Sequence, residues 1–147
     1  MILERPILIV DDDPDYSSLL QLALQEVQVK NPIEILADGL AAVNYLKENE
    51  SSNTAEIVRT PALMLLDLRM PGLGGLEVLR WIKTQDRLRE VPVVVFTGTE
   101  QNCESSQANE LGAAALHVKP FSYRELVQKI ASICDDYLSA REVRRAA

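Results

Sequence analysis

Short apolar segments recur along the chain, separated by longer stretches of mixed polarity. They are rich in Ile, Val and Leu and mostly lack alternation with polar residues. This pattern is typical of strands that are covered on both faces, as in parallel sheets. Strands are therefore expected at residues 7–10, 33–36, 62–66, 91–96 and 114–118.

The stretches between these segments have helical periodicity, with apolar residues three or four positions apart. The pattern is clearest after the last segment, where Leu126 and Ile130 fall on one helix face. Near the start of the chain, Asp13 and Pro14 combine an N-cap residue with a proline at the first helical position. Alternating strands and helices predict an α/β fold with a doubly wound parallel sheet and right-handed crossovers.

Two segments depart from this regular pattern. The helix expected at about 103–111 has little more than Ala108 and Leu111 as its apolar stripe. A helix with so little to bury is a candidate moving part. Residues 48–60 are polar and lack clear periodicity, which predicts an extended loop between the second helix and the third strand.

Polar residues follow four of the expected strands. Asp11 and Asp12 follow the first, Asp67 the third, Thr97 the fourth and Lys119 the fifth. In open α/β sheets, ligands bind at the carboxyl edge of the strands, so these side chains should meet there. Carboxylates suit Mg²⁺, and a hydroxyl and an ammonium suit the oxygens of a phosphoryl group. The pattern therefore predicts a site for a divalent cation and a phosphoryl group.

The composition and net charge of the chain argue against some classes of binding partner. The chain has 147 residues, which suits a single domain over 1–147, and a formal net charge of -7. Binding to a nucleic-acid backbone needs a basic face, so no direct nucleic-acid partner is expected. No apolar run is long enough to span a bilayer and no signal peptide is evident, so no membrane partner and a cytoplasmic location are expected.

Four motifs carry a resemblance to a known family: IVDDD (9–13), LLDLRMPGLGG (65–75), VVFTGT (94–99) and HVKPF (117–121). In this order and at these intervals they resemble the CheY-like receiver domain of bacterial response regulators. The resemblance runs from about residue 7 to residue 138. It implies a flavodoxin-like sheet with five parallel strands in the order 2-1-3-4-5 and five helices. It also implies a receiver domain with no output domain attached.

The resemblance assigns roles to the acidic residues. Asp67 matches the aspartate that accepts a phosphoryl group in this family. Asp12 matches the direct Mg²⁺ ligand and Asp11 the acidic partner that binds the ion through water. Asp67 would also bind the ion, and the backbone carbonyl of Arg69 would complete the protein ligands. Asp13 is expected to cap a helix instead.

Further positions match the switching part of such domains. Thr97 resembles the hydroxyl residue that moves toward the phosphoryl group. Lys119 resembles the lysine that bridges to it, and the family pattern implies a cis Lys119–Pro120 bond. Leu116 stands where many receivers have an aromatic residue that turns inward, so this part of the coupling should differ here.

The resemblance implies a switch of a two-component system, which catalyses only its own phosphorylation and dephosphorylation. Its expected partners are a sensor histidine kinase or a phosphotransfer protein, and a downstream protein. The long 48–60 segment resembles stand-alone regulators that partner bacterial phytochromes. The expected output face is roughly 103–138, which could also form a homodimer.

Two alternatives remain open at this stage. One is a Mg²⁺-dependent phosphatase of the haloacid-dehalogenase class, with Asp11, Asp13, Thr97 and Lys119 in its motifs; that reading leaves Asp67 without a role. The other is a receiver that acts only as a docking module, against which the complete set of site residues argues.

Overall fold

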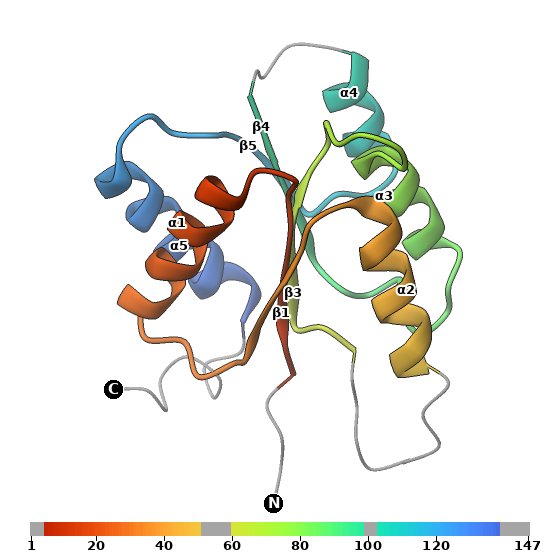
Figure 1. Ribbon diagram of the computed structural model, residues 1–147, viewed down its shortest axis with the longest axis horizontal. Helices are drawn as coiled ribbons and strands as arrows, with labels where there is room; N and C mark the ends of the chain where they lie inside the picture. The colour runs from red at the N-terminus through yellow and green to blue at the C-terminus, as the bar shows by residue number, and fades with distance from the viewer. Residues whose placement is uncertain (1–4, 51–59, 99–102, 139–147) are drawn as a thin grey trace, which may run out of the picture.

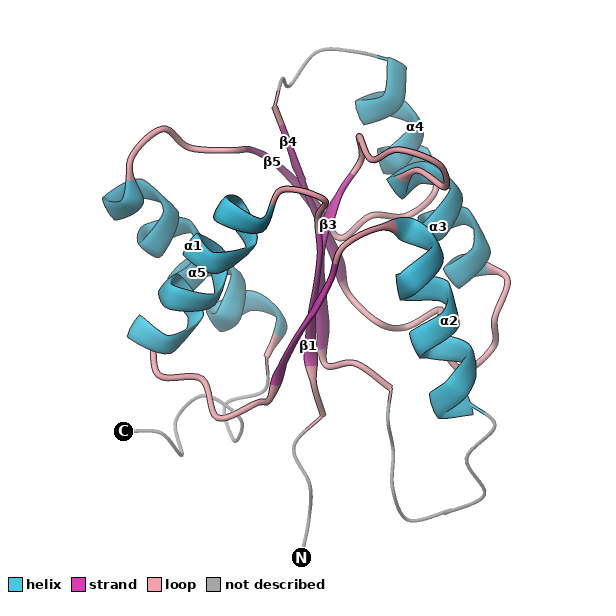
Figure 2. Cartoon of the chain, viewed as in Figure 1, coloured by secondary structure: helices cyan, strands magenta, loops and turns pink. Residues whose placement is uncertain are grey.

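A computed structural model describes residues 5–50, 60–98 and 103–138. Within these ranges the chain forms one five-stranded parallel sheet in the order β2-β1-β3-β4-β5. Figure 1 shows the strands running in one direction, and Figure 2 distinguishes them by colour from the surrounding helices. The strands are β1 (Ile7–Val10), β2 (Ile33–Leu36), β3 (Leu63–Asp67), β4 (Val93–Thr97) and β5 (Ala115–Val118).

Helices alternate with the strands and cover both faces of the sheet. In Figure 1, α1 and α5 lie on one side, and α2, α3 and α4 lie on the other. Their bounds are α1 (Pro14–Glu26), α2 (Gly39–Glu50), α3 (Gly75–Lys83), α4 (Cys103–Glu110) and α5 (Tyr123–Tyr137). This is the doubly wound arrangement and the strand order expected from the sequence. No helix in these ranges has the length and apolar character needed to cross a membrane.

The core is divided between the two faces of the sheet because successive side chains of a strand point in opposite directions. Ile7 and Ile9 of β1 pack in a cluster with α1 and α5. Leu8 and Val10 pack in a second cluster with α2, α3 and α4. All residues of β1, β3 and β4 are buried, which explains why their sequences lack polar alternation.

Several details differ from the sequence expectations. Both β3 and β4 begin and end later than predicted, so that Asp67 and Thr97 are the last residues of strands. Residues 48–50 belong to α2 rather than to a loop, because the helix continues beyond its apolar face; 51–59 lie outside the described residues. The Lys119–Pro120 bond is trans, the isomer preferred by most X–Pro bonds, so the cis expectation was wrong.

The turn after β3 packs tightly beneath the strand end. A side chain at Gly75 would collide with the backbone carbonyl of Asp67, and Gly72 has a φ of +74°, which favours glycine. The Gly74 N–H donates a hydrogen bond of 2.9 Å to the Glu77 carboxylate, which caps α3. These contacts hold the residue after Asp67 close to the sheet.

Candidate functional site

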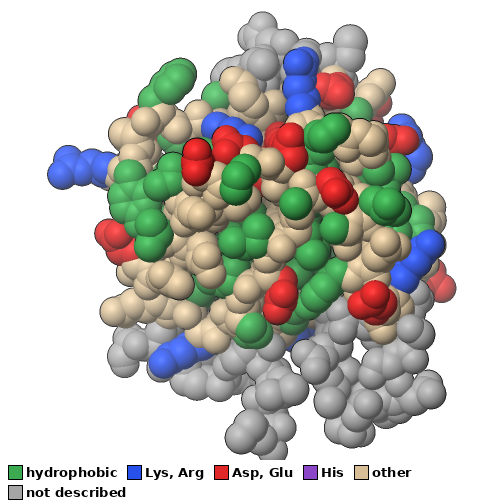
Figure 3. All heavy atoms as spheres, in the orientation of Figure 1, with side chains coloured by type: hydrophobic (Ala, Val, Ile, Leu, Met, Phe, Trp, Pro, Cys, Tyr) green, Lys and Arg blue, Asp and Glu red, His purple; other side chains and the backbone are tan. Residues whose placement is uncertain are grey.

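The residues predicted at strand ends do meet at the carboxyl edge of the sheet. Asp11 and Asp12 follow β1, Asp67 ends β3, Thr97 ends β4 and Lys119 follows β5. Figure 3 shows acidic side chains gathered beside basic ones in the upper part of the face, where Figure 1 places the loop that follows β1.

Three carboxylates form the centre of the site. One oxygen from each of Asp11, Asp12 and Asp67 lies within 4.8 Å of the others. Asp11 and Asp67 are only 3% and 7% exposed, whereas Asp12 faces solvent. An exposed carboxylate beside two buried ones leaves room for water ligands, and the all-oxygen donor set suits a hard divalent cation such as Mg²⁺ or Mn²⁺.

Backbone N–H groups orient the two buried carboxylates. The Asp13 N–H donates to Asp11 Oδ1 at 2.9 Å, and the Arg69 N–H donates to Asp67 Oδ1 at 3.3 Å. In each case the donor comes two residues later, as the chain turns away from its strand. The sharp turns at the strand ends thus fix how the carboxylates face one another.

Lys119 supplies the positive charge of the site. Its Nζ lies 3.1 Å from Asp11 Oδ2 and 3.7 Å from Asp67 Oδ2, so it bridges both buried carboxylates. The Lys119 N–H also donates to the Thr97 carbonyl oxygen at 2.8 Å, which joins the ends of β4 and β5. Of the two carboxylates, Asp11 is the nearer partner.

The pKa of Asp67 reflects its burial close to two other carboxylates. The pKa of Asp67 is raised to about 6. Burial is the largest cause and the charges of Asp11 and Asp12 add to the rise, while Lys119 and the backbone N–H of Arg69 lower the pKa. Without a cation, the carboxyl group therefore holds its proton more firmly than an ordinary aspartate.

The remaining predicted residues lie around this centre. Asp13 caps α1 by accepting hydrogen bonds from the Asp15 and Tyr16 N–H groups, as expected. Arg69 points its side chain outward, where Nε lies 3.2 Å from Glu104 in the first turn of α4. Leu116 is half-buried on β5 and packs against the cluster under α2, α3 and α4.

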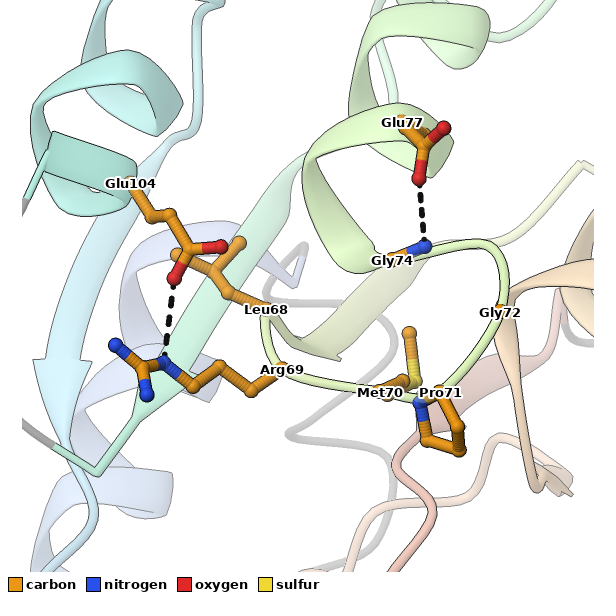
Figure 4. A pocket seen from close by; sticks show the side chains of 8 residues that line it. All are labelled: Leu68, Arg69, Met70, Pro71, Gly72, Gly74, Glu77 and Glu104. Carbon is orange, nitrogen blue, oxygen red and sulfur yellow. Dashed lines mark hydrogen bonds and ion pairs between the residues drawn. The ribbon is translucent and has the colours of Figure 1, made fainter.

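An open pocket of about 790 Å³ lies beside the acidic centre. Figure 4 shows that it lies between the loop after β3 and the start of α4, with the Arg69–Glu104 ion pair crossing from one to the other. None of the three carboxylates lines it. The loop after β3 and α4 are thus connected here by exposed side chains.

Sequence reasoning missed Tyr16. Its ring lies under the ammonium of Lys119, with 4.7 Å between Nζ and the ring centroid. The available signal was an aromatic residue in the first turn of the helix that follows the acidic cluster. Periodicity alone assigns such a residue to the core, and only the tertiary structure places it beside Lys119.

Comparison with known proteins agrees with this geometry. The family model described as "Response regulator receiver domain" matches residues 7–131. The chain belongs to this family.

The receiver has relatives of similar length and several of about twice its length. It is 33% identical over 132 residues to the probable methanogenesis regulatory protein FilR2 of Methanothrix harundinacea, covering 90% of this chain and 83% of that one. It spans about half the length of the matched transcriptional regulators.

Solved structures of receivers have the same fold. The Mn²⁺-bound form of response regulator Rcp1, known from Synechocystis, is 32% identical with a TM-score of 0.76, covering 92% of this chain and 95% of that one. The phosphorylated cyanobacterial phytochrome response regulator RcpA is 29% identical with a TM-score of 0.80, covering 93% and 96%. The receiver is thus a phosphorylation-based signalling domain, and the haloacid-dehalogenase alternative was wrong.

The raised pKa of Asp67 predicts a pH-dependent effect of Asp67→Asn on stability. The unfolded carboxyl ionises near its ordinary pKa of 3.8 and the folded one near 6. Between these values the folded state binds more protons, so the free energy of unfolding falls as pH rises. The asparagine side chain does not ionise, so Asp67→Asn avoids this loss of stability. In EDTA at pH 7.5, the variant should have a free energy of unfolding roughly 1–2 kcal/mol above that of the wild type. At pH 4, the two should differ little.

Urea denaturation at several pH values measures this difference. Asp136→Asn, which changes an exposed carboxylate on α5, provides the control and should show no such pH trend. An equal effect of Asp67→Asn at pH 4 and pH 7.5 would exclude the electrostatic explanation.

Proposed function

We propose that this receiver accepts a phosphoryl group on Asp67 from a histidine kinase or a phosphotransfer protein, in a Mg²⁺-dependent reaction. The observation that supports it best is the convergence of Asp11, Asp12 and Asp67 with Lys119 at one edge of the sheet. Phosphoryl transfer needs positioning and charge neutralisation, and this group of residues is suited to both.

In the proposed reaction, an Asp67 carboxylate oxygen attacks the phosphorus and an O–P bond forms. The P–N bond to the donor histidine breaks, and the imidazole nitrogen keeps the electron pair and takes up a proton. The proposed Mg²⁺ ligands are Asp12, Asp67, Asp11 through water and the Arg69 carbonyl. When bound, Mg²⁺ offsets the negative charge of the carboxylates and the phosphoryl group.

Lys119 and Thr97 respond to the new group in this proposal. The ammonium of Lys119 already lies 3.7 Å from Asp67, so it can pair with a phosphoryl oxygen after a small movement. Thr97 is buried at the end of the neighbouring strand and supplies a hydroxyl donor. Hydrolysis of the acyl phosphate returns the domain to its starting state, so the only chemistry is on the receiver itself.

The proposed input is a phytochrome-like histidine kinase in the cytoplasm. The support is the similarity over most of the chain to RcpA, which is named as a phytochrome response regulator. We further propose that residues 1–147 act as one receiver domain, with a separate protein as the downstream partner.

The proposed output face comprises α4, β5 and α5, and it is also the proposed surface for self-association. Among residues 104–110 of α4, whose burial is described, only Ser105 and Ala108 are buried, so few side chains attach this helix to the core. The Arg69–Glu104 ion pair connects this helix to the loop after Asp67. Leu116 has no ring to turn inward, so the response rests on movement of the loop and α4.

Labelling tests the acceptor assignment. Phosphoramidate and Mg²⁺ should add one base-labile phosphoryl group to the wild-type chain and none to Asp67→Asn, which lacks the nucleophilic oxygen. Intact-protein mass spectrometry measures the addition. Undiminished labelling of Asp67→Asn would place the acceptor elsewhere, and a wild-type chain that never labels would favour the docking-only alternative.

Removal of Asp12 tests the metal site. Asp12→Ala should abolish Mg²⁺-dependent labelling while the circular dichroism spectrum is retained, because Asp12 is exposed and contributes to no core. Asp15→Ala is a matched control, since Asp15 is an exposed carboxylate nearby that lies outside the acidic cluster. Normal labelling of Asp12→Ala with Mg²⁺ would exclude Asp12 as a ligand.

The ion pair between Arg69 and Glu104 predicts how firmly α4 is held. Arg69→Gln should increase amide hydrogen exchange in the first turns of α4 about two- to fivefold, the range expected for a partly exposed ion pair. Arg89→Gln is the control, because it breaks an exposed ion pair, Arg89–Asp86, that does not include a residue of α4. Exchange in α4 that is equal in both variants would contradict the prediction.

Beryllofluoride, a phosphoryl mimic, extends the same measurement to the output face. With Mg²⁺, it should change amide exchange most within residues 97–120. Larger changes in α2 would place the output face on the other helices.

A further inference from the structure

Tyr16 is an aromatic residue in contact with the charged centre of the site. It lies in the first turn of α1, where Asp13 caps the helix and Pro14 begins it. Its N–H donates to Asp13 Oδ1 at 3.4 Å, so the cap that starts the helix also fixes the backbone of Tyr16. The side chain is half-buried and packs against the cluster under α1 and α5.

The ring of Tyr16 faces the ammonium of Lys119. The separation of 4.7 Å from Nζ to the ring centroid lies within the range of a cation–π interaction. The same Nζ lies 3.1 Å from Asp11 and 3.7 Å from Asp67. The ammonium is therefore enclosed by two carboxylates and one aromatic face.

A lysine needs such a constraint if it is to remain in one place. Its four-carbon stem has many rotamers, and the ammonium carries no fixed geometry of its own. Asp11 and Asp67 lie on neighbouring strands and attract the ammonium from two directions. The ring adds a third contact that comes from a helix.

The hydroxyl of Tyr16 behaves differently from its ring. The oxygen is fully enclosed and has no hydrogen-bond partner among the described residues. Burial and the charges of Asp11 and Asp67 raise the pKa of the phenol, so the hydroxyl stays protonated. The contact with Lys119 is made by the ring, and a ring without the hydroxyl can supply it.

We propose that Tyr16 is a positioning residue for Lys119, whose ring holds the ammonium between Asp11 and Asp67 ready to pair with a phosphoryl oxygen. The contact itself is a property of the unphosphorylated domain. Its consequence for phosphoryl binding rests on the proposed function of Asp67 and Lys119. Tyr16 itself touches neither the acceptor oxygen nor the phosphoryl group in this proposal.

The alternative is that Tyr16 only fills space. Tyr137 is the matched residue for this comparison, because it also packs against the cluster under α1 and α5. Its hydroxyl donates to the Ala114 carbonyl oxygen at 3.0 Å, on a different part of the fold from Lys119. Tyr137→Leu therefore reports the general effect of losing a packed ring.

The experiment compares Tyr16→Phe, Tyr16→Leu and Tyr137→Leu by NMR. A ring over the ammonium shifts the Lys119 ε-methylene resonance upfield, and that resonance is identified by its absence from Lys119→Arg. The shift should persist in Tyr16→Phe and Tyr137→Leu and disappear in Tyr16→Leu. If Tyr16→Leu does not fold, Tyr16→Met replaces it, because methionine fills the space without a ring. An unchanged Lys119 resonance in the variant without a ring would overturn the proposal.

Beryllofluoride binding with Mg²⁺ then tests the consequence. Affinity should fall roughly three- to tenfold in Tyr16→Leu, the range of a partly desolvated cation–π contact. It should stay within about twofold in Tyr16→Phe and Tyr137→Leu. Equal affinity in Tyr16→Leu and Tyr137→Leu, or an equal loss in Tyr16→Phe and Tyr16→Leu, would overturn the positioning role. Failure of the wild-type chain to bind beryllofluoride would instead contradict the proposed function, while the NMR comparison would still test the contact.

Discussion

The mutual repulsion of carboxylates at one edge of the sheet is the constraint on which the site depends. Two of the three, Asp11 and Asp67, are buried, and both turn toward Lys119. Burial and the neighbouring charges raise the pKa of Asp67, so the ionised cluster is costly without added positive charge. Among the described residues, Lys119 pairs with both buried carboxylates and offsets part of their charge. A bound cation, or a change of charge at this edge, therefore changes the electrostatic energy of the cluster.

The rest of the fold makes that crowding possible. Strands β1, β3 and β4 are buried along their whole length, so they hold their last residues rigidly against repulsion. By contrast, α4 buries only two of its residues at 104–110 and is connected to the loop after β3 by the exposed Arg69–Glu104 pair. Buried strand ends beside a helix with few buried residues are the arrangement expected of a domain in which a local change of charge displaces a surface helix.

Two aromatic contacts lie on the opposite face of the sheet from α4. Tyr16 contacts Lys119, and Phe96 of β4 stacks on His117 of β5 with ring centroids 5.6 Å apart. Both Tyr16 and Phe96 belong to the cluster under α1 and α5. Leu116, which faces the other cluster, supplies no ring on the side of α4. The aromatic contact to the charged centre therefore comes from Tyr16, on the α1–α5 side.

The sequence by itself determined the fold class, the strand order through its family motifs, and the four chain segments that carry the site. It could do so because strand periodicity and strand-end residues are local features, and parallel strands necessarily bring their ends together. The sequence did not determine that Lys119 lies nearer Asp11 than Asp67, that Tyr16 lies under the ammonium, or that Arg69 reaches Glu104. Those contacts join residues far apart in the chain, and only the packing of helices on the sheet decides their distances.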